Sequence, residues 1–149
     1  MNLFEAEGEN MLTIVGAGIK IKNQHGLYPP SYLMDGNLNN FAHSLEANDG
    51  MWMRVNLETQ SSVTKVIIYN RLSCCKDRIV GASVFIKTGD EYVKDCGKVS
   101  SAENSYTFNC EGDGNVIEIS QEGTVGDWNI AEIKVYGTPA KIPSPGLDI

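Results

Sequence analysis

The sequence predicts an all-β domain, built as an antiparallel sandwich or barrel of short strands. Six segments are rich in β-branched and aromatic residues or alternate between apolar and polar positions, as strands do. Glycine-containing pairs that favour turns, such as Asp35-Gly36 and Gly89-Asp90, separate many of the segments. No stretch keeps a helical period of 3.6 over three turns. The six segments are Met51–Glu58, Val63–Asn70, Ala82–Asp90, Ser105–Cys110, Asn115–Gln121 and Ala131–Gly137.

Alternation within a segment indicates which side chains share a face. In Met51–Glu58, the apolar Met53 and Val55 lie opposite Trp52 and Arg54, because successive side chains of a strand point to opposite faces. Such a pattern is typical of a strand with one buried face. The two tryptophans, Trp52 and Trp128, are expected to anchor the core or a loop.

Length and charge exclude several classes of function. A chain of 149 residues is long enough to bury a core as one ordinary domain. Its 12 basic residues against 19 acidic ones give a formal net charge of −7, which disfavours binding to nucleic acid or to anionic lipid. The apolar runs are far too short to span a membrane. We therefore expect no nucleic-acid partner and no membrane insertion.

Four cysteines suggest an oxidised protein. Cys74 and Cys75 are adjacent, while Cys96 and Cys110 bracket a short segment. Adjacent cysteines have Cα atoms only about 3.8 Å apart, so either each bonds a distant partner or the two close a strained ring. No C-x-x-C pair is present, and both histidines lie far upstream, so the pattern does not indicate zinc. The cysteines favour an extracellular, secreted protein.

The order of motifs resembles the discoidin, or coagulation-factor type C, fold. Asp35–Asn37 (DGN) is followed by MWMRVNLE, then VTKVIIYNR, and finally IAEIKVYG. Within that group, His43 followed by Arg71, the Cys74-Cys75 pair and Arg78 is similar to the F-type lectins, which bind L-fucose. The resemblance implies a jelly-roll β-sandwich of the galactose-binding-domain-like kind. We expect the domain to span residues 1–137, with residues 138–149 as a linker or disordered tail.

The resemblance also implies a sugar site. In that family the histidine and both arginines, here His43, Arg71 and Arg78, hydrogen-bond the sugar. The adjacent cysteines, here Cys74 and Cys75, form a vicinal disulfide that packs on its apolar edge. Arginine suits this role because its fork of donors stays charged at any working pH.

The chain departs from the lectin pattern around this site. The carboxylate that the family commonly places two residues after the first arginine is replaced by Ser73, so Asp77 or another acid would have to take its part. The stretch DGNLNNFAH is shorter and poorer in aromatic residues than usual. Phe41, Leu27 or Tyr28 would have to hold the methyl group of fucose.

A structural calcium ion is the second implication of the resemblance. Asp35 and Asn37 match its loop ligands, Glu132 matches the acid of the closing strand, and Asn40 is an additional candidate. Oxygen ligands of this kind suit calcium. Many family members tie this loop to the last strand by a disulfide, but Phe41 and Ala131 stand at those positions here. Cys96 and Cys110 match a cross-strand bridge of the family.

Each candidate residue also has an ordinary structural use. A histidine such as His43 can cap or cover a surface, and Asp-Gly pairs commonly shape turns. The two arginines can form surface ion pairs, which contribute little to stability. Four cysteines permit three connectivities. The ordinary partners of the arginines would be Asp77 or Glu46, and Glu132 would be a solvent-facing strand residue.

The motifs together predict a carbohydrate-binding lectin that recognises L-fucose or a related sugar on glycans. The alternative is a discoidin-type adhesion module that binds a protein or membrane ligand through its loops. An enzyme is not expected, because no pair of carboxylates stands out and a disulfide-bonded cysteine is no nucleophile. The expected partners are fucosylated or related glycans, and the domain could form a homo-oligomer or be part of a multidomain chain.

Overall fold

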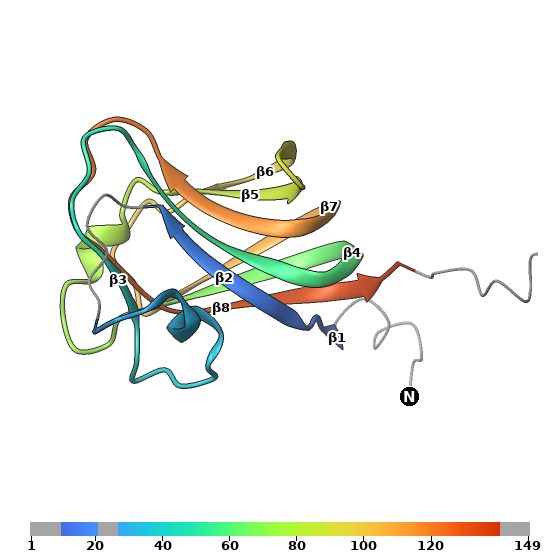
Figure 1. Ribbon diagram of the computed structural model, residues 1–149, viewed down its shortest axis with the longest axis horizontal. Helices are drawn as coiled ribbons and strands as arrows, with labels where there is room; N and C mark the ends of the chain where they lie inside the picture. Colours follow the sequence, from blue (N-terminus) through green and yellow to red (C-terminus); the bar gives the residue numbers. More distant parts are fainter. Residues whose placement is uncertain (1–9, 21–26, 141–149) are drawn as a thin grey trace, which may run out of the picture.

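Two long strands, β4 (Met51–Asn70) and β7 (Ser105–Gln121), run through both layers of the structure. The structure is a computed structural model that describes residues 10–20 and 27–140. Every strand pairing in it is antiparallel (Figure 1). The other elements are β1 (Asn10–Met11), β2 (Ile14–Lys20), β3 (Ala42–Ser44), β5 (Ser83–Thr88), β6 (Glu91–Lys98), β8 (Trp128–Pro139) and the 3-10 helices η1 (Pro30–Met34) and η2 (Lys76–Ile79).

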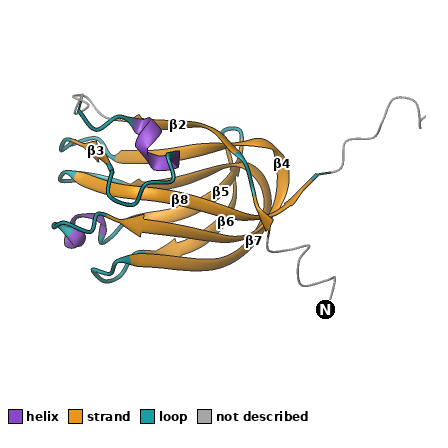
Figure 2. Cartoon of the chain, turned by 90° about the horizontal axis from the view of Figure 1, so that it is seen from below, coloured by secondary structure: helices purple, strands orange, loops and turns teal. Residues whose placement is uncertain are grey.

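The two halves of the β4–β7 pair belong to different layers. Near the start of β4, Trp52 lies opposite Ser120, and near its end Ile68 lies opposite Tyr106, with the pairing interrupted between Asn56 and Ser61. The first half carries β2 on one side and β5 and β6 on the other. We call this the β5 layer. The second half carries β8, to which β1 and β3 are added, and forms the β8 layer (Figure 2). The predicted antiparallel sandwich is confirmed.

The core lies between the two layers and follows the predicted alternation. Met53 and Val55 are fully buried, whereas Trp52 and Arg54 are only partly buried on the opposite face. Each fully buried aliphatic side chain contributes about 1.5–3 kcal/mol relative to an exposed one. Trp128 is fully buried, as expected of a core residue. The other central core residues are Ile68, Val84, Ile86, Ile117, Ile119, Ile133 and Val135.

The strand boundaries differ from the prediction in two ways. The six predicted segments form four strands, because β4 and β7 each join two of them. Strand β8 also continues to Pro139, two residues beyond the expected end at Gly137, and pairs Pro139 with Ser61. Gly137 permits this pairing, since a Cβ atom there would lie 2.0 Å from the carbonyl oxygen of Ser62. Residues 141–149 of the expected tail and His25 lie outside the described residues.

The part of the chain that the structure describes holds no helix long and apolar enough to cross a membrane.

Both disulfides join the partners that the lectin resemblance implied. Cys96 of β6 bonds Cys110 of β7, with Cα atoms 5.4 Å apart. Cys74 bonds its neighbour Cys75. The first bridge ties the edge of the β5 layer to β7, whereas the second closes no loop of chain.

We predict that the two disulfides differ in their effect on stability. Cys96 and Cys110 are separated by 14 positions, and a loop of about 15 residues corresponds to about 3 kcal/mol of unfolded-state entropy. The Cys96→Ser/Cys110→Ser variant should lose about that free energy of unfolding in urea titrations. The Cys74→Ser/Cys75→Ser variant should lose less than about 1 kcal/mol, because it opens no loop. Equal losses would contradict this difference.

Candidate functional site

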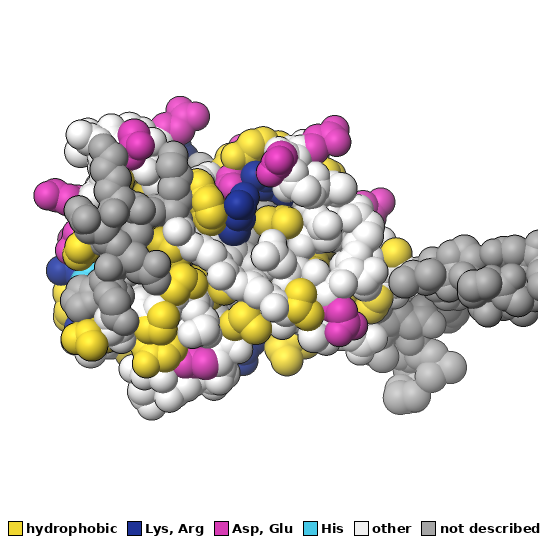
Figure 3. Space-filling view, viewed as in Figure 1, with side chains coloured by type: hydrophobic (Ala, Val, Ile, Leu, Met, Phe, Trp, Pro, Cys, Tyr) yellow, Lys and Arg dark blue, Asp and Glu magenta, His cyan; other side chains and the backbone are white. Residues whose placement is uncertain are grey.

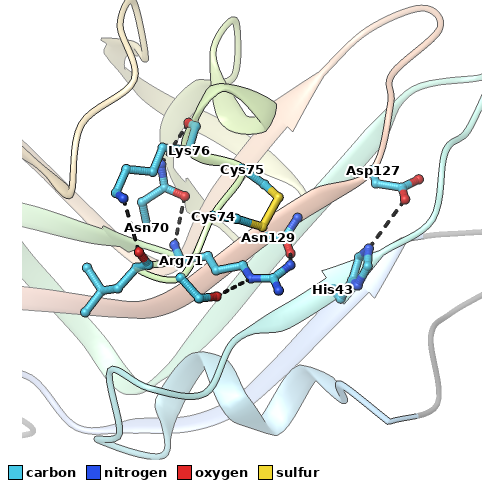
Figure 4. Close-up of a disulfide and its surroundings, with 10 residues drawn as sticks. His43, Asn70, Arg71, Cys74, Cys75, Lys76, Asp127 and Asn129 are labelled. Atoms are coloured by element: carbon cyan, nitrogen blue, oxygen red, sulfur yellow. Dashed lines mark hydrogen bonds and ion pairs between the residues drawn. A yellow bond between two sulfur atoms is a disulfide. The ribbon is translucent and has the colours of Figure 1, made fainter.

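The buried side chain of Asn70, at the end of β4, fixes the loop that follows it (Figure 4). Its Nδ2 donates to the carbonyl oxygens of Lys76 at 2.9 Å and of Glu103 at 3.1 Å, and its Oδ1 accepts from the backbone N–H of Arg71 at 2.8 Å. Asn70 is 1% exposed. A polar group buried this deeply must keep its hydrogen bonds, so both ends of the loop from Arg71 to Lys76 are held in place.

The vicinal disulfide forms the tip of this loop. Cys75 has φ 67° and ψ 30°, and it is the one residue other than glycine with positive φ in the described ranges. This left-handed conformation costs a residue with a side chain about 1–3 kcal/mol. The Cys75 carbonyl oxygen then accepts from the backbone N–H of Arg78 at 3.2 Å, at the start of η2. Both cysteines remain partly exposed.

Arg71 is held by neutral partners. Its Nε donates to Ser73 Oγ at 2.8 Å, and its Nη1 donates to Asn129 Oδ1 at 2.9 Å. Its guanidinium carbon lies 4.1 Å from the centre of the Phe41 ring. Ser73 and Asn129, and not Asp77, therefore orient this arginine. Neither Ser73 nor Asn129 carries a negative charge, so neither neutralises the guanidinium of Arg71.

Phe41 connects Arg71 to an aromatic cluster. The rings of Tyr28 and Phe41 stack at 4.6 Å with an angle of 12° between their planes. Phe41 is buried beneath Arg71, whereas Tyr28 is partly exposed and Leu27 is exposed. Of the three residues expected to hold a sugar methyl group, two thus form one packed unit.

His43 reaches the same region from β3. It lies opposite Asn129 of β8, and its backbone N–H donates to the Tyr28 carbonyl oxygen at 3.3 Å. Its Nε2 lies 3.5 Å from Asp127 Oδ2, and its side chain is 12% exposed. Figure 4 shows His43, Arg71, Asn129 and the disulfide on adjoining segments. The structure thus brings the predicted His43 into the same region as the predicted residues of the disulfide loop, Arg71, Cys74 and Cys75.

Arg78 lies on η2, directly after the disulfide, and is exposed. In the described residues, neither it nor Arg71 forms an ion pair with Asp77 or Glu46. The alternative considered from the sequence, in which the two arginines form surface ion pairs with Asp77 or Glu46, is therefore wrong. The loop carries a further cation, Lys76, whose Nζ donates to the Leu72 carbonyl oxygen at 3.2 Å.

The four calcium candidates surround the loop after η1. The carboxylate of Asp35 accepts hydrogen bonds from the backbone N–H of Asn37 at 2.9 Å and from Asn40 Nδ2 at 3.1 Å. Asn37 Oδ1 in turn accepts from the backbone N–H of Asn39. Both carboxylate oxygens of Glu132 accept from the N–H of Gly36, at 3.2 and 3.1 Å. All four residues thus belong to one network of short contacts.

Glu132 is buried, so the ordinary alternative of a solvent-facing strand residue is wrong. Burial, with a further contribution from neighbouring Asp35, raises the pKa of Glu132 to about 7. The described ranges contain no group of three or more His, Cys, Asp or Glu side chains that could hold a metal. The four candidates are two carboxylates, Asp35 and Glu132, and two carboxamides, Asn37 and Asn40. Oxygen ligands of both kinds are ones that calcium accepts.

Sequence reasoning missed Asn70, Asn129 and Asp127. The first two are polar residues in otherwise apolar strand segments, and both are almost fully buried. A buried asparagine in a strand needs partners from elsewhere in the fold, and this is the signal that would have marked them.

We predict that Asn70→Ala disorders the disulfide loop. The substitution leaves a backbone N–H and two carbonyl groups without their partner, at about 1–3 kcal/mol for each buried group. Amide hydrogen exchange between Arg71 and Lys76 should accelerate at least tenfold, beyond any change in the rest of β4. The matched control is Asn115→Ala, which removes a single exposed contact to the N–H of Gly89. Unchanged exchange in the loop would contradict this role of Asn70.

Comparison with known proteins places the fold and the site in context. Residues 32–119 match the family model of the NedA-like, galactose-binding domain. A pentraxin fusion protein of Xenopus laevis is 28% identical in an alignment of 98 residues that covers 61% of this chain and 24% of that protein. The chain thus spans about a quarter of the length of that relative.

Two solved structures share the fold. A fucose-binding module of Streptococcus pneumoniae is 19% identical with a TM-score of 0.72, covering 82% of this chain and 90% of that one. A fucolectin from striped bass serum (Morone saxatilis) is 24% identical with a TM-score of 0.72, covering 86% of this chain and 49% of that one. The match to the family model covers more than half of the sequence, and the chain belongs to the coagulation factor 5/8 type C family, in its NedA-like, galactose-binding group.

Proposed function

We propose that this domain is a lectin that binds L-fucose or a closely related sugar through His43, Arg71, Arg78 and the Cys74–Cys75 disulfide. The observation that carries the proposal is the partly exposed vicinal disulfide beside an arginine that only neutral groups hold. Structures that share the fold, a fucose-binding module and a fucolectin, support it.

The contacts of Arg71 suit recognition of a neutral sugar. Ser73, Asn129 and the Phe41 ring fix the guanidinium from three sides. Little side-chain entropy is then lost on binding, which matters for a ligand with few atoms. Its remaining N–H donors are free of carboxylate partners and can donate charge-assisted hydrogen bonds to sugar hydroxyls.

The other groups of the proposed site supply either polar or apolar contacts to the sugar. Arg78, on the 3-10 helix η2 directly after the disulfide, adds an exposed cation to the partly buried Arg71. The sulfur atoms of Cys74 and Cys75 offer an apolar surface without flexible torsions. The stacked rings of Tyr28 and Phe41 lie beside Arg71, and the partly exposed Tyr28 offers apolar surface for a methyl group. This division favours a deoxy sugar such as fucose over a fully hydroxylated hexose.

We propose binding without catalysis, in an extracellular setting. All four cysteines, which lie in the described residues, are in disulfides. None of them is therefore a thiol nucleophile. Disulfides persist in oxidising compartments, which supports secretion.

Alanine at either arginine should weaken fucose binding severely. Each substitution removes a hydrogen bond to a charged group, about 1.5–3 kcal/mol, which is roughly 10- to 100-fold in affinity. Isothermal titration with L-fucose checks this for Arg71→Ala and Arg78→Ala. Lys65→Ala is the matched control, because Lys65 is a cation that packs on Tyr136 of the β8 layer. Wild-type affinity in both arginine variants would move the site elsewhere.

The Cys74→Ser/Cys75→Ser variant tests the disulfide in the same titrations. It should bind at least tenfold more weakly while it keeps its free energy of unfolding. Retained fucose binding would show that the disulfide is not a contact surface.

We further propose that Asp35, Asn37, Asn40 and Glu132, with backbone carbonyl groups, hold a structural calcium ion. A buried carboxylate beside a second carboxylate is unfavourable without a cation. The ion would fix the loop between η1 and β3, and β3 carries His43.

Calcium should raise the melting temperature, and a chelator should reverse the rise. A ligand at 100 times its Kd stabilises the folded state by about 2.7 kcal/mol. Thermal unfolding with calcium or chelator measures the effect in the wild type and in Asp35→Asn, which should lose it. Asp77→Asn, an exposed acid on η2, should keep it. A melting temperature that is independent of calcium would contradict the proposal.

A further inference from the structure

The outer face of the β5 layer forms a groove whose lining includes no residue of the disulfide loop from Arg71 to Lys76. The cavity there has a volume of about 790 Å³, within the usual range for ligand sites. Cross-strand register brings Trp52, Ser120 and Ser83 into one row across the sheet, and Glu118 and Phe85 into the next. Figure 3 shows basic and acidic side chains beside hydrophobic ones on the face turned to the viewer. The sheet groove is defined here by Trp52, Ser83, Phe85, Tyr92, Glu118 and Ser120.

Its floor is a buried polar network. Glu118 and Lys87 are 2% and 4% exposed, and their Oε1 and Nζ atoms lie 3.0 Å apart. The hydroxyl of Tyr92 donates to the other oxygen of Glu118 at 2.6 Å. The hydrogen bond to Glu118 raises the pKa of Tyr92 to about 12. A buried ion pair is weak evidence for stability, and here it fixes the side chains at the base of an open groove.

Aromatic rings lie along the groove. The Phe85 and Tyr92 rings meet edge to face at 5.0 Å, and the guanidinium of Arg54 stacks 3.9 Å from the centre of the Trp52 ring. Trp52 and Phe85 are partly exposed, and Tyr92 is 57% exposed. These contacts restrain the rings while leaving apolar surface open to a ligand.

The charges of the groove differ from those of the Arg71 site. The acids Asp49 and Glu122 line it together with Glu118, whose charge Lys87 neutralises, and the basic groups are Lys98 and the Arg54 guanidinium stacked on Trp52. The charges nearly balance, so the groove favours a ligand without a net charge. A peptide strand would need an exposed backbone edge, whereas the groove floor is the face of a hydrogen-bonded sheet. Aromatic surface with hydroxyl and carboxylate groups matches the apolar faces and hydroxyls of pyranose rings.

We propose that the sheet groove is a second binding site, for a neutral oligosaccharide. Its volume exceeds what a single pyranose would fill. The groove uses none of the residues that hold fucose in the function proposed above, so either site can exist without the other.

The experiment begins with the Arg71→Ala/Arg78→Ala variant, which silences the first site. It is screened on a printed array of neutral, fucose-free oligosaccharides of two to six hexose units, with sialylated and sulfated oligosaccharides beside them. We expect binding to neutral structures, weakened at least tenfold by adding Trp52→Ala or Tyr92→Ala. Lys65→Ala, added in the same way, is the matched control and should leave binding unchanged.

Nuclear magnetic resonance locates the bound sugar in the same variant. The indole N–H signal of Trp52 should shift on titration with the best array ligand. Trp128, which is fully buried, serves as the internal reference and should shift less. Folding of the Trp52→Ala and Tyr92→Ala variants is checked by their circular dichroism.

Three outcomes would overturn the proposal. The first is absence of neutral ligands on the array, and the second is binding to acidic glycans alone. The third is a dimer in light scattering that Trp52→Ala dissociates, which would assign the groove to a second copy of the chain. If the wild type proves not to bind fucose, all of these readouts can still be interpreted, because the variant screened on the array already lacks the proposed fucose site.

Discussion

The disulfide loop depends on one buried carboxamide, that of Asn70. Burial denies this side chain hydrogen bonds with water, so its donor and acceptor must be satisfied inside the protein. The groups that satisfy it are the backbone of Arg71, Lys76 and Glu103. The end of β4 is thereby tied both to the loop and to the segment before β7. This tie offsets the cost of the left-handed backbone at Cys75 and keeps the two cysteines at the surface.

The Arg71 site and the sheet groove follow opposite electrostatic rules. Arg71 contacts only neutral oxygens and an aromatic ring, so its charge remains available in a chain whose net charge is −7. Lys87 and Glu118 neutralise each other beneath the sheet groove, so that floor presents polarity without an uncompensated charge. The first arrangement favours donation to ligand oxygens, and the second favours a ligand that also has no charge.

Local pattern was sufficient for the central strands, whereas the Cys74–Cys75 pairing was predicted from the family resemblance and not from the spacing. Met53 and Val55 alternate with polar neighbours, and adjacent cysteines between two arginines are visible in any reading of the chain. The edge strand β6 was missed because most of its residues are exposed, so it lacks an apolar face. The burial of Glu132 was not predicted, because alternation describes one strand, whereas this burial comes from packing elsewhere in the fold. The role of Asn129 likewise depends on Arg71, a contact across 58 positions.

Rigidity is the property that connects these features. A monosaccharide offers few atoms for contacts, so the free energy of these contacts cannot offset the entropy lost when several flexible side chains become ordered. In this domain the ordering happens during folding: Asn70 holds the loop, Ser73 and Asn129 hold Arg71, and a ring of two cysteines replaces longer apolar side chains. The free energy of the fold thus maintains a surface that a small ligand can use without rearranging it. Under the proposed function, substitutions in these supporting residues should therefore change affinity as much as substitutions in the residues proposed to touch the sugar.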